Sequence, residues 1–501
     1  MTEQPKEPGA PIERRTFLSA ALVGLIGKTD PPILGGFVND DFIRGHQLRD
    51  RLKFAPPERT VKMPIVIVGG GMAGLCAAWQ LSKRGFRDYI LLEMEGQAGG
   101  NSRSGNNAVS AYPWGAHYVP VPSQRSQLVY ELFSELGLVH NGVWDERQLC
   151  FAPQERLFLH GEWQEGIEPH DALTAHDRQQ MERFGSRMRE FRATGQFTIP
   201  MAAGARPSPL DQISMAEWLR GEKFDSRYLN WYVNYACRDD YGALAQATSA
   251  WAGVHYFASR EPEEKGPLTW PEGNGWLVKR LIERVGQHVR TDSMVHSIRR
   301  DRTRWRVACH DVEYVAEAVI FAAPTFLAPY VLDPVPAVPK REYSPWMTAN
   351  LTVERPPKQN GAETAWDNVI YDSPALGYVV ATHQSLRTYE ERSVWTYYWS
   401  LAEGSPAANR RLLLEKDWGF WRDAMLNDLS RAHPDIRRCI SRIDVMRFGH
   451  AMARPTPGFL GMAAPKAERL FFANSDQSGF SIFEEAQYRG VMAADHALAK
   501  A

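Results

Sequence analysis

The sequence predicts an α/β protein in which a parallel sheet is combined with a second, α+β region. Three observations lead to this class. Residues 63–68 are a short β-branched run typical of a strand buried on both faces. Three consecutive glycines follow at once, and an apolar helical pattern fills residues 72–84. A second apolar run at residues 89–92 then completes the order strand, turn, helix, strand, which predicts two parallel strands joined by a crossover helix.

The glycine spacing in this turn predicts a dinucleotide site. Gly69, Gly71 and Gly74 would permit a tight turn, a close approach to a pyrophosphate and close packing of helix on strand. Phosphate oxygens would bind the free N–H groups at the helix start, around Ala73. Glu93 stands 24 positions after Gly69, where a carboxylate can accept both hydroxyls of an adenosine ribose. The alternative is that the glycines only make a turn, but the strand, the helix and the acid together favour a dinucleotide.

The segment after the second strand indicates which dinucleotide is bound. Residues 98–104, AGGNSRS, resemble the glycine doublet of the flavin-containing amine oxidase family, which lies against the FAD pyrophosphate. The resemblance implies FAD and not a nicotinamide cofactor, with contacts from Gly99, Gly100 and Asn101. Relatives usually carry arginines two before and one after the doublet, where this chain has Gln97 and Asn101. Arg103 is therefore expected to supply part of the phosphate neutralisation.

Further segments resemble the same family in order along residues 63–498. Residues 112–118, YPWGAHY, resemble the segment that runs along the flavin ring. This implies contacts from Gly115 and Ala116 and makes His117 a candidate catalytic residue; the alternative is a histidine in a structural hydrogen bond. Residues 270–277, WPEGNGWL, resemble a family helix entry. A strand at 289–298 implies an adenine contact near Val295, and the buried run 318–324 implies a chain reversal beside the FAD at Ala323.

The C-terminal stretch resembles the family's closing motif. A strand at residues 469–473 is followed by polar residues and then by a helix. The helix N-terminus, aimed at the pyrimidine end of the flavin, would stabilise the negative charge that gathers there on reduction. The match implies that Ser475 or Asp476 contacts the ribityl or phosphate end, and that Phe483 lies at the flavin.

The resemblance gives the predicted fold in full. A discontinuous Rossmann-like FAD-binding domain is expected from residues 61–119, 250–330 and 446–501. An α+β substrate-binding domain with a mixed or antiparallel sheet is expected from residues 120–249 and 331–445. Helical patterns occupy residues 127–136, 176–191 and 412–429, and strand patterns occupy 347–354 and 393–401. The aromatic residues of 395–399 suit an apolar or cationic substrate, and they equally suit an ordinary core sheet.

Departures from the family concern the chemistry. Asn350 stands where many relatives carry a lysine that hydrogen-bonds a water beside flavin N5, so Asn350 is the second candidate catalytic residue. Relatives with covalent FAD have a cysteine shortly before the closing strand, whereas no cysteine follows Cys439 here. Non-covalent FAD is therefore expected. Ile482 takes the place of the aromatic that sandwiches an amine, between Phe480 and Phe483.

Composition and the N-terminus limit partners and location. The net charge of −1 over 501 residues implies no nucleic acid partner. The five cysteines are scattered, so neither a disulfide framework nor a metal site is expected. Arg14 and Arg15 precede a short apolar stretch at 19–27, which resembles a twin-arginine export signal. Residues 1–60 are thus a signal and an extended lead-in, the expected location is the periplasm, and the cytoplasm is the alternative. Contact with a membrane is expected only through the signal.

The expected function is FAD-dependent oxidation of a C–N or C–C bond in a small organic substrate, an amine first, by hydride transfer. The electron acceptor is O2 or another, unidentified acceptor. One alternative is a desaturase or protoporphyrinogen-oxidase-like enzyme acting on a large apolar substrate. Another is an exported flavin-binding protein without turnover. A nicotinamide dehydrogenase is the least favoured class, since it gives the doublet and the closing motif no role.

Overall fold

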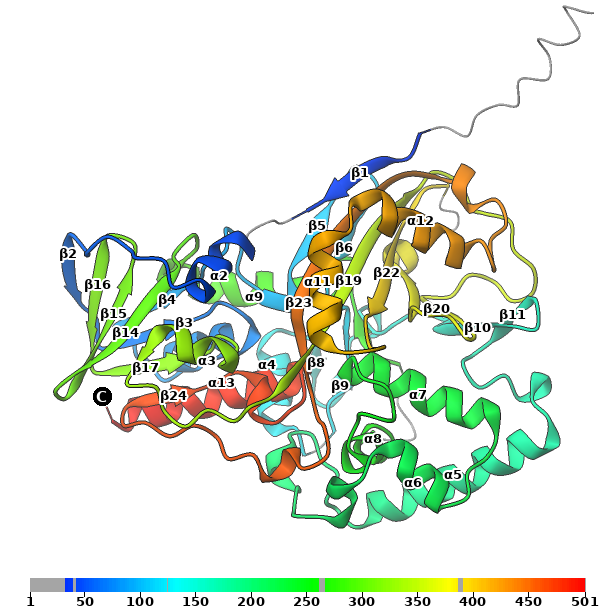
Figure 1. The fold of residues 1–501 in the computed structure, drawn as a ribbon, viewed down its shortest axis with the longest axis horizontal. Coiled ribbons are helices and arrows are strands. Elements are labelled where there is room, and N and C mark those ends of the chain that lie inside the picture. The colour runs from blue at the N-terminus through cyan, green and yellow to red at the C-terminus, as the bar shows by residue number, and fades with distance from the viewer. Residues whose placement is uncertain (1–31, 39–41, 124, 261–265, 386–390, 501) are drawn as a thin grey trace, which may run out of the picture.

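The computed structural model describes residues 32–38, 42–123, 125–260, 266–385 and 391–500. The expected twin-arginine signal lies outside these residues. Figure 1 shows two halves side by side, with the chain's C-terminus in one half and a large sheet, underlain by helices, in the other. Within the described residues we find no helix whose length and apolar content would let it span a bilayer.

The first half is built on a five-stranded parallel sheet, which confirms the predicted class. Its central strands β3 (Ile65–Val68) and β4 (Tyr89–Leu92) are fully buried and are joined by α3 (Met72–Lys83), as predicted. The sheet has the order β13-β4-β3-β17-β24, with β13 at Val289–Arg290, β17 at Ala318–Phe321 and β24 at Leu470–Phe472. One face packs against α3, α4 (Gln127–Glu135), α9 (Gly275–Val285) and α13 (Phe483–Leu498).

A second five-stranded sheet covers the other face. Its order is β18 (Leu332–Asp333), β14 (Val295–Asp301), β15 (Arg304–Cys309), β16 (Val312–Ala316) and β2 (Arg59–Lys62). The single strand predicted at 289–298 is wrong: it is divided between β13 and β14, which belong to different sheets. The chain turns between them at Asp292, whose φ of 52° interrupts an extended backbone.

The second half contains the mixed eight-stranded sheet that was predicted as mixed or antiparallel. Its order is β1 (Leu34–Phe37), β23 (Ile440–Arg454), β19 (Glu342–Val353), β22 (Ser393–Ser400), β21 (Gly377–Val380), β20 (Asp367–Ile370), β10 (Glu155–Leu159) and β11 (Glu162–Glu165). The β1–β23 and β10–β20 pairs are parallel, and the others are antiparallel.

Two helices, α11 (Pro406–Glu415) and α12 (Trp418–Leu429), lie over one face of the large sheet. The single helix predicted at 412–429 is therefore wrong. The break falls at Asp417, whose side chain caps α12 by accepting from Phe420 N at 2.8 Å. Trp395 and Tyr397 of β22 pack in the core beneath these helices, while Tyr398 faces the other side. Most of the aromatic row is thus ordinary core.

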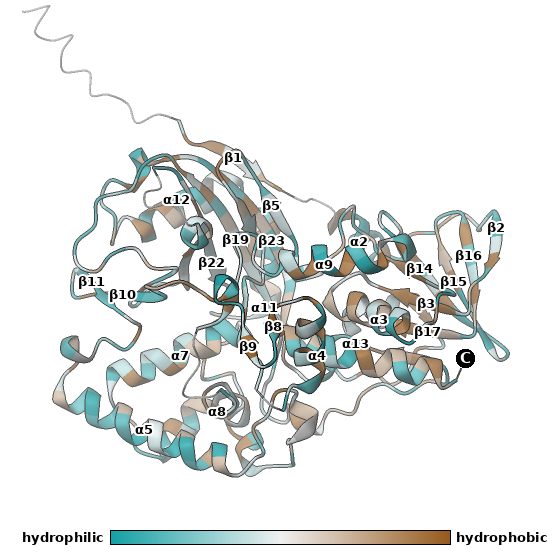
Figure 2. Ribbon diagram, turned by 180° about the vertical axis from the view of Figure 1, so that it is seen from behind, coloured by the Kyte–Doolittle hydropathy of each residue, from teal (hydrophilic) through white to brown (hydrophobic). Residues whose placement is uncertain are grey.

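A helical layer lies below the sheet in Figure 1. It consists of α5 (Ala175–Ala193), α6 (Met215–Gly221), α7 (Arg227–Tyr241) and α8 (Ala250–Ala258), which share one apolar cluster. The outermost helix, α5, is mostly teal in Figure 2, in keeping with its predicted charged character. Short elements complete the chain: β5 (Ser104–Asn106), β6 (Ala111–Pro113), β7 (Tyr118–Val119), β8 (Val139–His140), β9 (Val143–Trp144), β12 (Leu268–Thr269) and α10 (Ala328–Val331).

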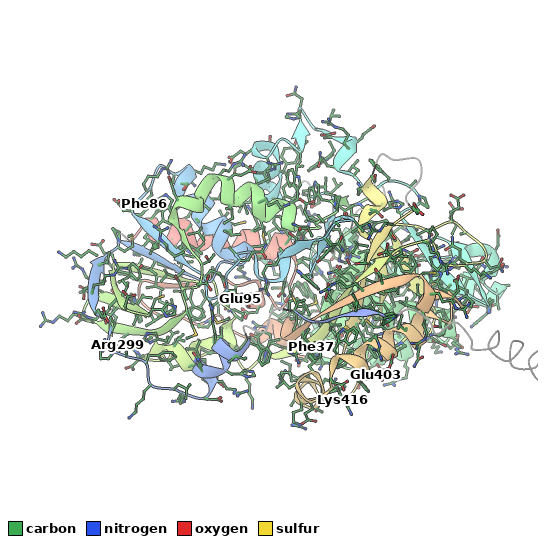
Figure 3. The ribbon with its side chains drawn as sticks, turned by 90° about the horizontal axis from the view of Figure 1, so that it is seen from above. Phe37, Phe86, Glu95, Arg299, Glu403 and Lys416 are labelled. Atoms are coloured by element: carbon green, nitrogen blue, oxygen red, sulfur yellow. The ribbon has the colours of Figure 1, made fainter. Side chains whose placement is uncertain are left out.

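The boundaries between the halves differ from those expected. Because β23 pairs with β19 along its length, the chain returns to the first half after residue 454 and not at 446. Helix α8, expected in the FAD-binding domain, packs with α5, α6 and α7. The lead-in crosses both halves: β1 joins the large sheet, whereas Arg44 of α2 (Phe42–Arg49) donates to Met94 O at 2.8 Å. Figure 3 shows Phe37 of β1 and Glu95 near the middle of the molecule, where the halves meet.

Candidate functional site

The turn after β3 requires glycine for reasons of space. Gly69 has φ 104°, and a Cβ there would lie 2.8 Å from Ala323 N. A Cβ on Gly74 would lie 2.0 Å from Gly69 O, so the helix could not pack as it does. Gly71 is different, because the nearest atom to its Cβ would be Gly100 Cα at 4.0 Å. The space beside Gly71, at the start of α3, is open to a ligand.

The doublet lies directly against this turn. Gly99 N donates to Gly70 O at 2.8 Å, and both glycines of the doublet have positive φ, 126° and 56°. Asn101 O then accepts from Ala116 N at 2.8 Å, and a Cβ on Gly115 would lie 2.3 Å from Asn101 O. Three segments that are distant in the sequence therefore form one continuous surface. We call Gly69, Gly71, Gly74, Gly99 and Gly100 the glycine cradle.

Glu93 lies at one end of the cradle. Its Oε2 accepts from Gly70 N at 2.6 Å and its Oε1 from Glu95 N at 2.8 Å. Burial raises the pKa of this carboxyl, and the two backbone donors oppose that rise. Glu93 O also accepts from Ser293 N at 2.7 Å, so the chain that leads to Val295 passes beside it. Val295 itself begins β14, in the second sheet.

Arg103 is held beside the doublet. Its Nε donates to Gly100 O at 3.0 Å, and its guanidinium forms an ion pair with Glu95. The expected positive charge is thus present near the cradle, although Glu95 already pairs with it.

The closing motif approaches the cradle from the other side. Asn474 Nδ2 donates to Ala322 O at 3.1 Å. The buried Asp476 accepts from Thr325 N at 2.7 Å and from the Tyr343 hydroxyl at 2.8 Å, so this carboxylate is used by the protein. Ser475 is therefore the better candidate for cofactor contact. Helix α13 begins at Phe483, whose ring stacks on that of Phe133 at 5.5 Å.

A cavity of about 170 Å³ opens at the end of this surface. Asn101, Gly115, Ala116 and residues 481–483 form one wall, which we call the cofactor wall. The opposite wall comes from α7, α8 and the large sheet. Among the cavity-lining residues there is no cysteine, and all five cysteines of the chain are buried elsewhere.

His117 lines the cavity, as predicted. Its ring stacks on Tyr398 with centroids 4.6 Å apart, and the Tyr398 hydroxyl donates to Gly115 O at 2.8 Å. Burial lowers the pKa of His117 to about 4, so the imidazole is neutral near pH 7. His117 and Tyr398 together form a flat aromatic surface next to the cofactor wall.

Asn350, the other catalytic candidate, is not among the cavity-lining residues. Its Nδ2 donates to Pro113 O at 3.0 Å, and its Oδ1 accepts from Thr396 at 2.7 Å, so both ends of the amide are occupied. Thr348, two residues earlier on β19, lines the cavity. The predicted residue thus lies on a strand that reaches the cavity, but the β19 residues that line it are Trp346 and Thr348.

Two buried polar atoms on the cavity lining have no partner among the described residues. They are Oδ1 of Asn274 and Nε1 of Trp346. An acceptor and a donor left unpaired at a cavity are available to a ligand, because buried polar groups are otherwise hydrogen-bonded.

Four carboxylates also face the cavity: Asp239, Asp240, Asp367 and Glu484. Burial raises the pKa of each of them, that of Glu484 to about 7. Arg260 is the one Lys or Arg side chain in the cavity lining that the structure describes, and it pairs with Asp240 at 3.2 Å. The cavity is therefore acidic. No group of three or more His, Cys, Asp or Glu among the described residues is arranged to hold a metal ion.

Sequence reasoning missed this acid set, apart from Glu484 as part of the closing motif. Asp239 and Asp240 lie in the last turn of α7, where the helix dipole disfavours negative charge. Adjacent acids at the end of a helical pattern were the available signal. No sequence signal marked Asp367, since it is a single acid at the start of a strand.

The arrangement is that of an α/β dinucleotide-binding fold, and the open space beside Gly71 in the glycine cradle fits a pyrophosphate. Contacts of Glu93 with the ribose and of the start of α13 with the flavin stay predictions. The sequence model of the flavin-containing amine oxidoreductase family matches residues 72–498. The chain therefore belongs to this family and is an FAD-dependent oxidoreductase. No cysteine lines the cavity, so no thiol is available there for a covalent bond to FAD.

Solved structures with the same fold include several oxidases. Putrescine oxidase bound to putrescine matches with a TM-score of 0.68 at 16% identity, over 88% of this chain and 100% of that one. Cyclohexylamine oxidase from Brevibacterium oxydans IH-35A matches with 0.66 at 14% identity, over 87% and 99%. A putative protoporphyrinogen oxidase from Exiguobacterium sp. 255-15 matches with 0.63 at 15% identity, over 88% and 100%. No curated protein matches the sequence.

Proposed function

We propose that this enzyme oxidises a C–N bond of an amine that enters the cavity as a cation. One observation carries the proposal: four carboxylates but one described arginine line the cavity. A buried excess of negative charge is costly unless a cation neutralises it. The similarity to putrescine and cyclohexylamine oxidases supports the same chemistry.

Several residues of the cavity have distinct roles in the proposed reaction. The flavin, when bound, accepts the hydride from the substrate carbon. The stacked rings of His117 and Tyr398 give the substrate a flat, polarisable wall, and aromatic faces also attract an ammonium group. Oδ1 of Asn274 is free to accept a hydrogen bond from a bound ligand. Glu484, in the first turn of α13, is placed to take a proton from the ammonium, because burial has raised its pKa to about 7.

The alternative, oxidation of a large apolar substrate, draws support from the protoporphyrinogen oxidase match. The charge of the cavity argues against it. Four carboxylates would repel the propionate groups of a porphyrin precursor. Against an apolar substrate, the same carboxylates would have to lose their water of hydration. The other alternative, a flavin-binding protein without turnover, is also disfavoured. The cofactor wall is one side of the cavity, so a molecule in the cavity would lie next to the cofactor.

The test is an absorption spectrum of the purified protein before and after acid precipitation, followed by anaerobic addition of amines. We expect flavin bands in the supernatant and bleaching of the bound flavin by an alkylamine, but not by the alcohol of the same length. Bleaching by neutral or anionic compounds alone would contradict the proposal. A colourless protein that takes up no FAD would contradict the cofactor assignment.

We further infer that the protein is exported to the periplasm by the twin-arginine route. The arginine pair at 14–15, followed by Phe17, Leu18 and a short apolar stretch, supports this. Cell fractionation of the native chain and of a variant with Arg14→Lys and Arg15→Lys is the test. Equal cytoplasmic retention of both would contradict export.

A further inference from the structure

The lead-in to the first glycine-rich turn makes close contacts with both halves of the molecule. Figure 1 shows β1 along the large sheet and α2 on the other half; we call these two elements the strap. In β1, Gly35 has φ 136°, and a Cβ there would lie 1.8 Å from Ile443 O of β23. A Cβ on Gly36 would meet nothing within 4 Å. Glycine at position 35 is therefore what lets β1 approach the edge of the large sheet so closely.

Helix α2 is held on the FAD-binding half and at the same anchor as β1. Leu48 is 5% exposed and packs in the apolar cluster that also contains Leu92 of β4. The guanidinium of Arg447, on β23, lies 3.8 Å from the ring centroid of Phe37 in β1 and 5.2 Å from that of Phe42 in α2. Since one side chain of the large sheet holds both elements of the strap, displacing β1 would also loosen α2.

Arg44 of the strap reaches the segment that follows Glu93. Its guanidinium donates to Met94 O at 2.8 Å and pairs with Asp292 at 2.9 Å. The ion pair contributes little, because the Asp292 side chain is 60% exposed. The hydrogen bond to Met94 O is partly buried, and it fixes the backbone between Glu93 and Glu95.

The turn held in this way belongs to the edge of the glycine cradle. Glu95 N donates to Glu93 Oε1 at 2.8 Å, so the position of the Glu93 carboxylate depends on the turn at residues 93–95. The Glu95 side chain pairs with Arg103, whose Nε donates to Gly100 O at 3.0 Å. A shift of the turn is therefore passed both to Glu93 and to the doublet.

We propose that the strap helps to retain FAD, and that Arg44 is its positioning residue. The strap is anchored on the large sheet, Arg44 carries that anchorage to the turn, and the turn sets the positions of Glu93 and the doublet. Glu93 is the predicted ribose contact, so the effect falls on the adenosine end of FAD and not on the flavin ring. The proposal does not depend on the substrate, and it holds whether or not the enzyme oxidises amines.

The experiment measures FAD binding to the FAD-free protein by calorimetry, and FAD release after dilution of the loaded protein by the rise in FAD fluorescence. Arg44→Gln removes the contact with the turn. Its control is Arg49→Gln, which removes the same charge from the same helix, where Arg49 pairs with the next residue. Gly35→Ala displaces β1, and Gly36→Ala adds the same methyl group to free space. Arg44→Lys keeps a donor at the turn.

We expect Arg44→Gln to weaken FAD binding about two- to tenfold, the range that one hydrogen bond provides, through faster dissociation. Gly35→Ala acts in the same direction, because it releases the anchor on the large sheet. Arg44→Lys restores most of the affinity, whereas Arg49→Gln and Gly36→Ala bind FAD as the native protein does. The flavin absorption spectrum of each loaded variant is unchanged, since the flavin ring lies at the other end of the cofactor. Melting temperature shows which variants are folded, and Arg44→Gln tests the strap without altering β1.

Native FAD affinity in folded Arg44→Gln or in folded Gly35→Ala would overturn the strap. Equal losses in Arg49→Gln and Arg44→Gln would do the same, because charge alone would then explain the effect. An altered flavin spectrum in Arg44→Gln would also overturn it, since the effect would then reach the flavin ring. The proposed function is tested separately, by flavin reduction with an alkylamine at saturating FAD, and its failure would leave these binding results as they are.

Discussion

At the scale of single residues, the glycine cradle separates space needed for folding from space needed for the cofactor. Gly71→Ala adds a methyl group with ordinary clearance, 4.0 Å from Gly100 Cα, but into the open space at the start of α3. We expect an unchanged melting temperature without FAD and at least about tenfold weaker FAD binding, because the pyrophosphate can no longer approach the backbone. Calorimetric titration of the FAD-free protein with FAD measures this.

Gly74→Ala is the matched comparison. Its methyl group would meet Gly69 O at 2.0 Å, so the packing of α3 on β3 must change. We expect a loss of about 1–3 kcal/mol or more in the free energy of unfolding, with or without FAD. If Gly71→Ala destabilised the FAD-free protein as much as Gly74→Ala, the space beside Gly71 would be structural and the assignment of the pyrophosphate site would fail.

Single residues also show how far the sequence could predict the site. The cradle was predictable because each glycine performs a local backbone task that the spacing reveals. Asn350 lies on a strand that reaches the cavity, yet the residues of that strand that line it are Trp346 and Thr348. A side chain's direction depends on how β19 lies against its neighbours, which a motif does not encode. Asp239 and Asp367 are 128 positions apart in the numbering, and only the folded chain brings them to one cavity.

At the scale of elements, α13 connects the closing motif to the cradle. A Cβ on Gly490 would lie 2.2 Å from Ala73 O, so α13 packs against α3 backbone to backbone. We expect Gly490→Ala to push α13 outward, to lower the free energy of unfolding by about 1–3 kcal/mol and to weaken FAD binding as well, because the start of α13 moves with the helix. Urea unfolding and FAD titration measure the two effects.

The control is Gly221→Ala, at the end of α6, where a Cβ would meet nothing within 4 Å. It is expected to be neutral or slightly stabilising. If Gly490→Ala lowered stability without changing FAD affinity, the start of α13 would not contribute to cofactor binding.

The helices and strands also show which parts of the fold a local sequence pattern cannot predict. The strands β3, β4 and β17 and the helices α4 and α5 were predicted because their own apolar periodicity defines them. The division of 289–298 between two sheets and of 412–429 between two helices was not, since each break depends on one turn: at Asp292 and at the cap of Asp417. The predicted domain boundary at residue 446 was wrong because β23 continues beyond it, paired with β19. Pairing between two distant strands is not visible in the sequence of either strand alone.

At the scale of the whole molecule, the acidic cavity affects two quantities in opposite directions as pH rises above about 6.5. The free energy of unfolding of the ligand-free protein falls, whereas the affinity for a cationic ligand increases. Many ionisable groups face it from every side: Asp239, Asp240, Tyr235 and Tyr241 of α7, His255 and Arg260 from α8 and its end, Asp367 of β20, Tyr378 of β21, Tyr398 of β22, Glu484 of α13, and His117 and Tyr118. Burial raises the pKa of the acids and lowers that of His117 and His255 to about 4.

The contributions of the histidines and of the acids to the pH dependence of stability can be told apart above about pH 6.5, the ordinary pKa of histidine. Below it, the histidines bind more protons when unfolded and the acids bind more when folded, so the two contributions oppose each other. Above it the unfolded histidines lose their remaining protons within about one pH unit, while Glu484, with a pKa of about 7, still loses its proton on the way to pH 8. The folded state therefore binds more protons than the unfolded state in this window, and these groups make the ligand-free protein less stable as pH rises.

A bound amine should reverse this dependence. Alkylammonium groups keep their charge to about pH 10, like lysine, so between about pH 6.5 and 8 only the protein titrates. Each carboxylate that ionises on binding releases a proton and strengthens amine binding by up to about tenfold per pH unit. We expect the melting temperature of the FAD-loaded, reduced protein to fall from pH 6.5 to 8 without ligand. We expect the rise in melting temperature caused by an alkylamine to grow over the same range. In Asp367→Asn the growth should be smaller. A ligand effect that is constant or shrinks with pH would mean that the cavity acids are already ionised, and that the cavity receives its cation without releasing protons.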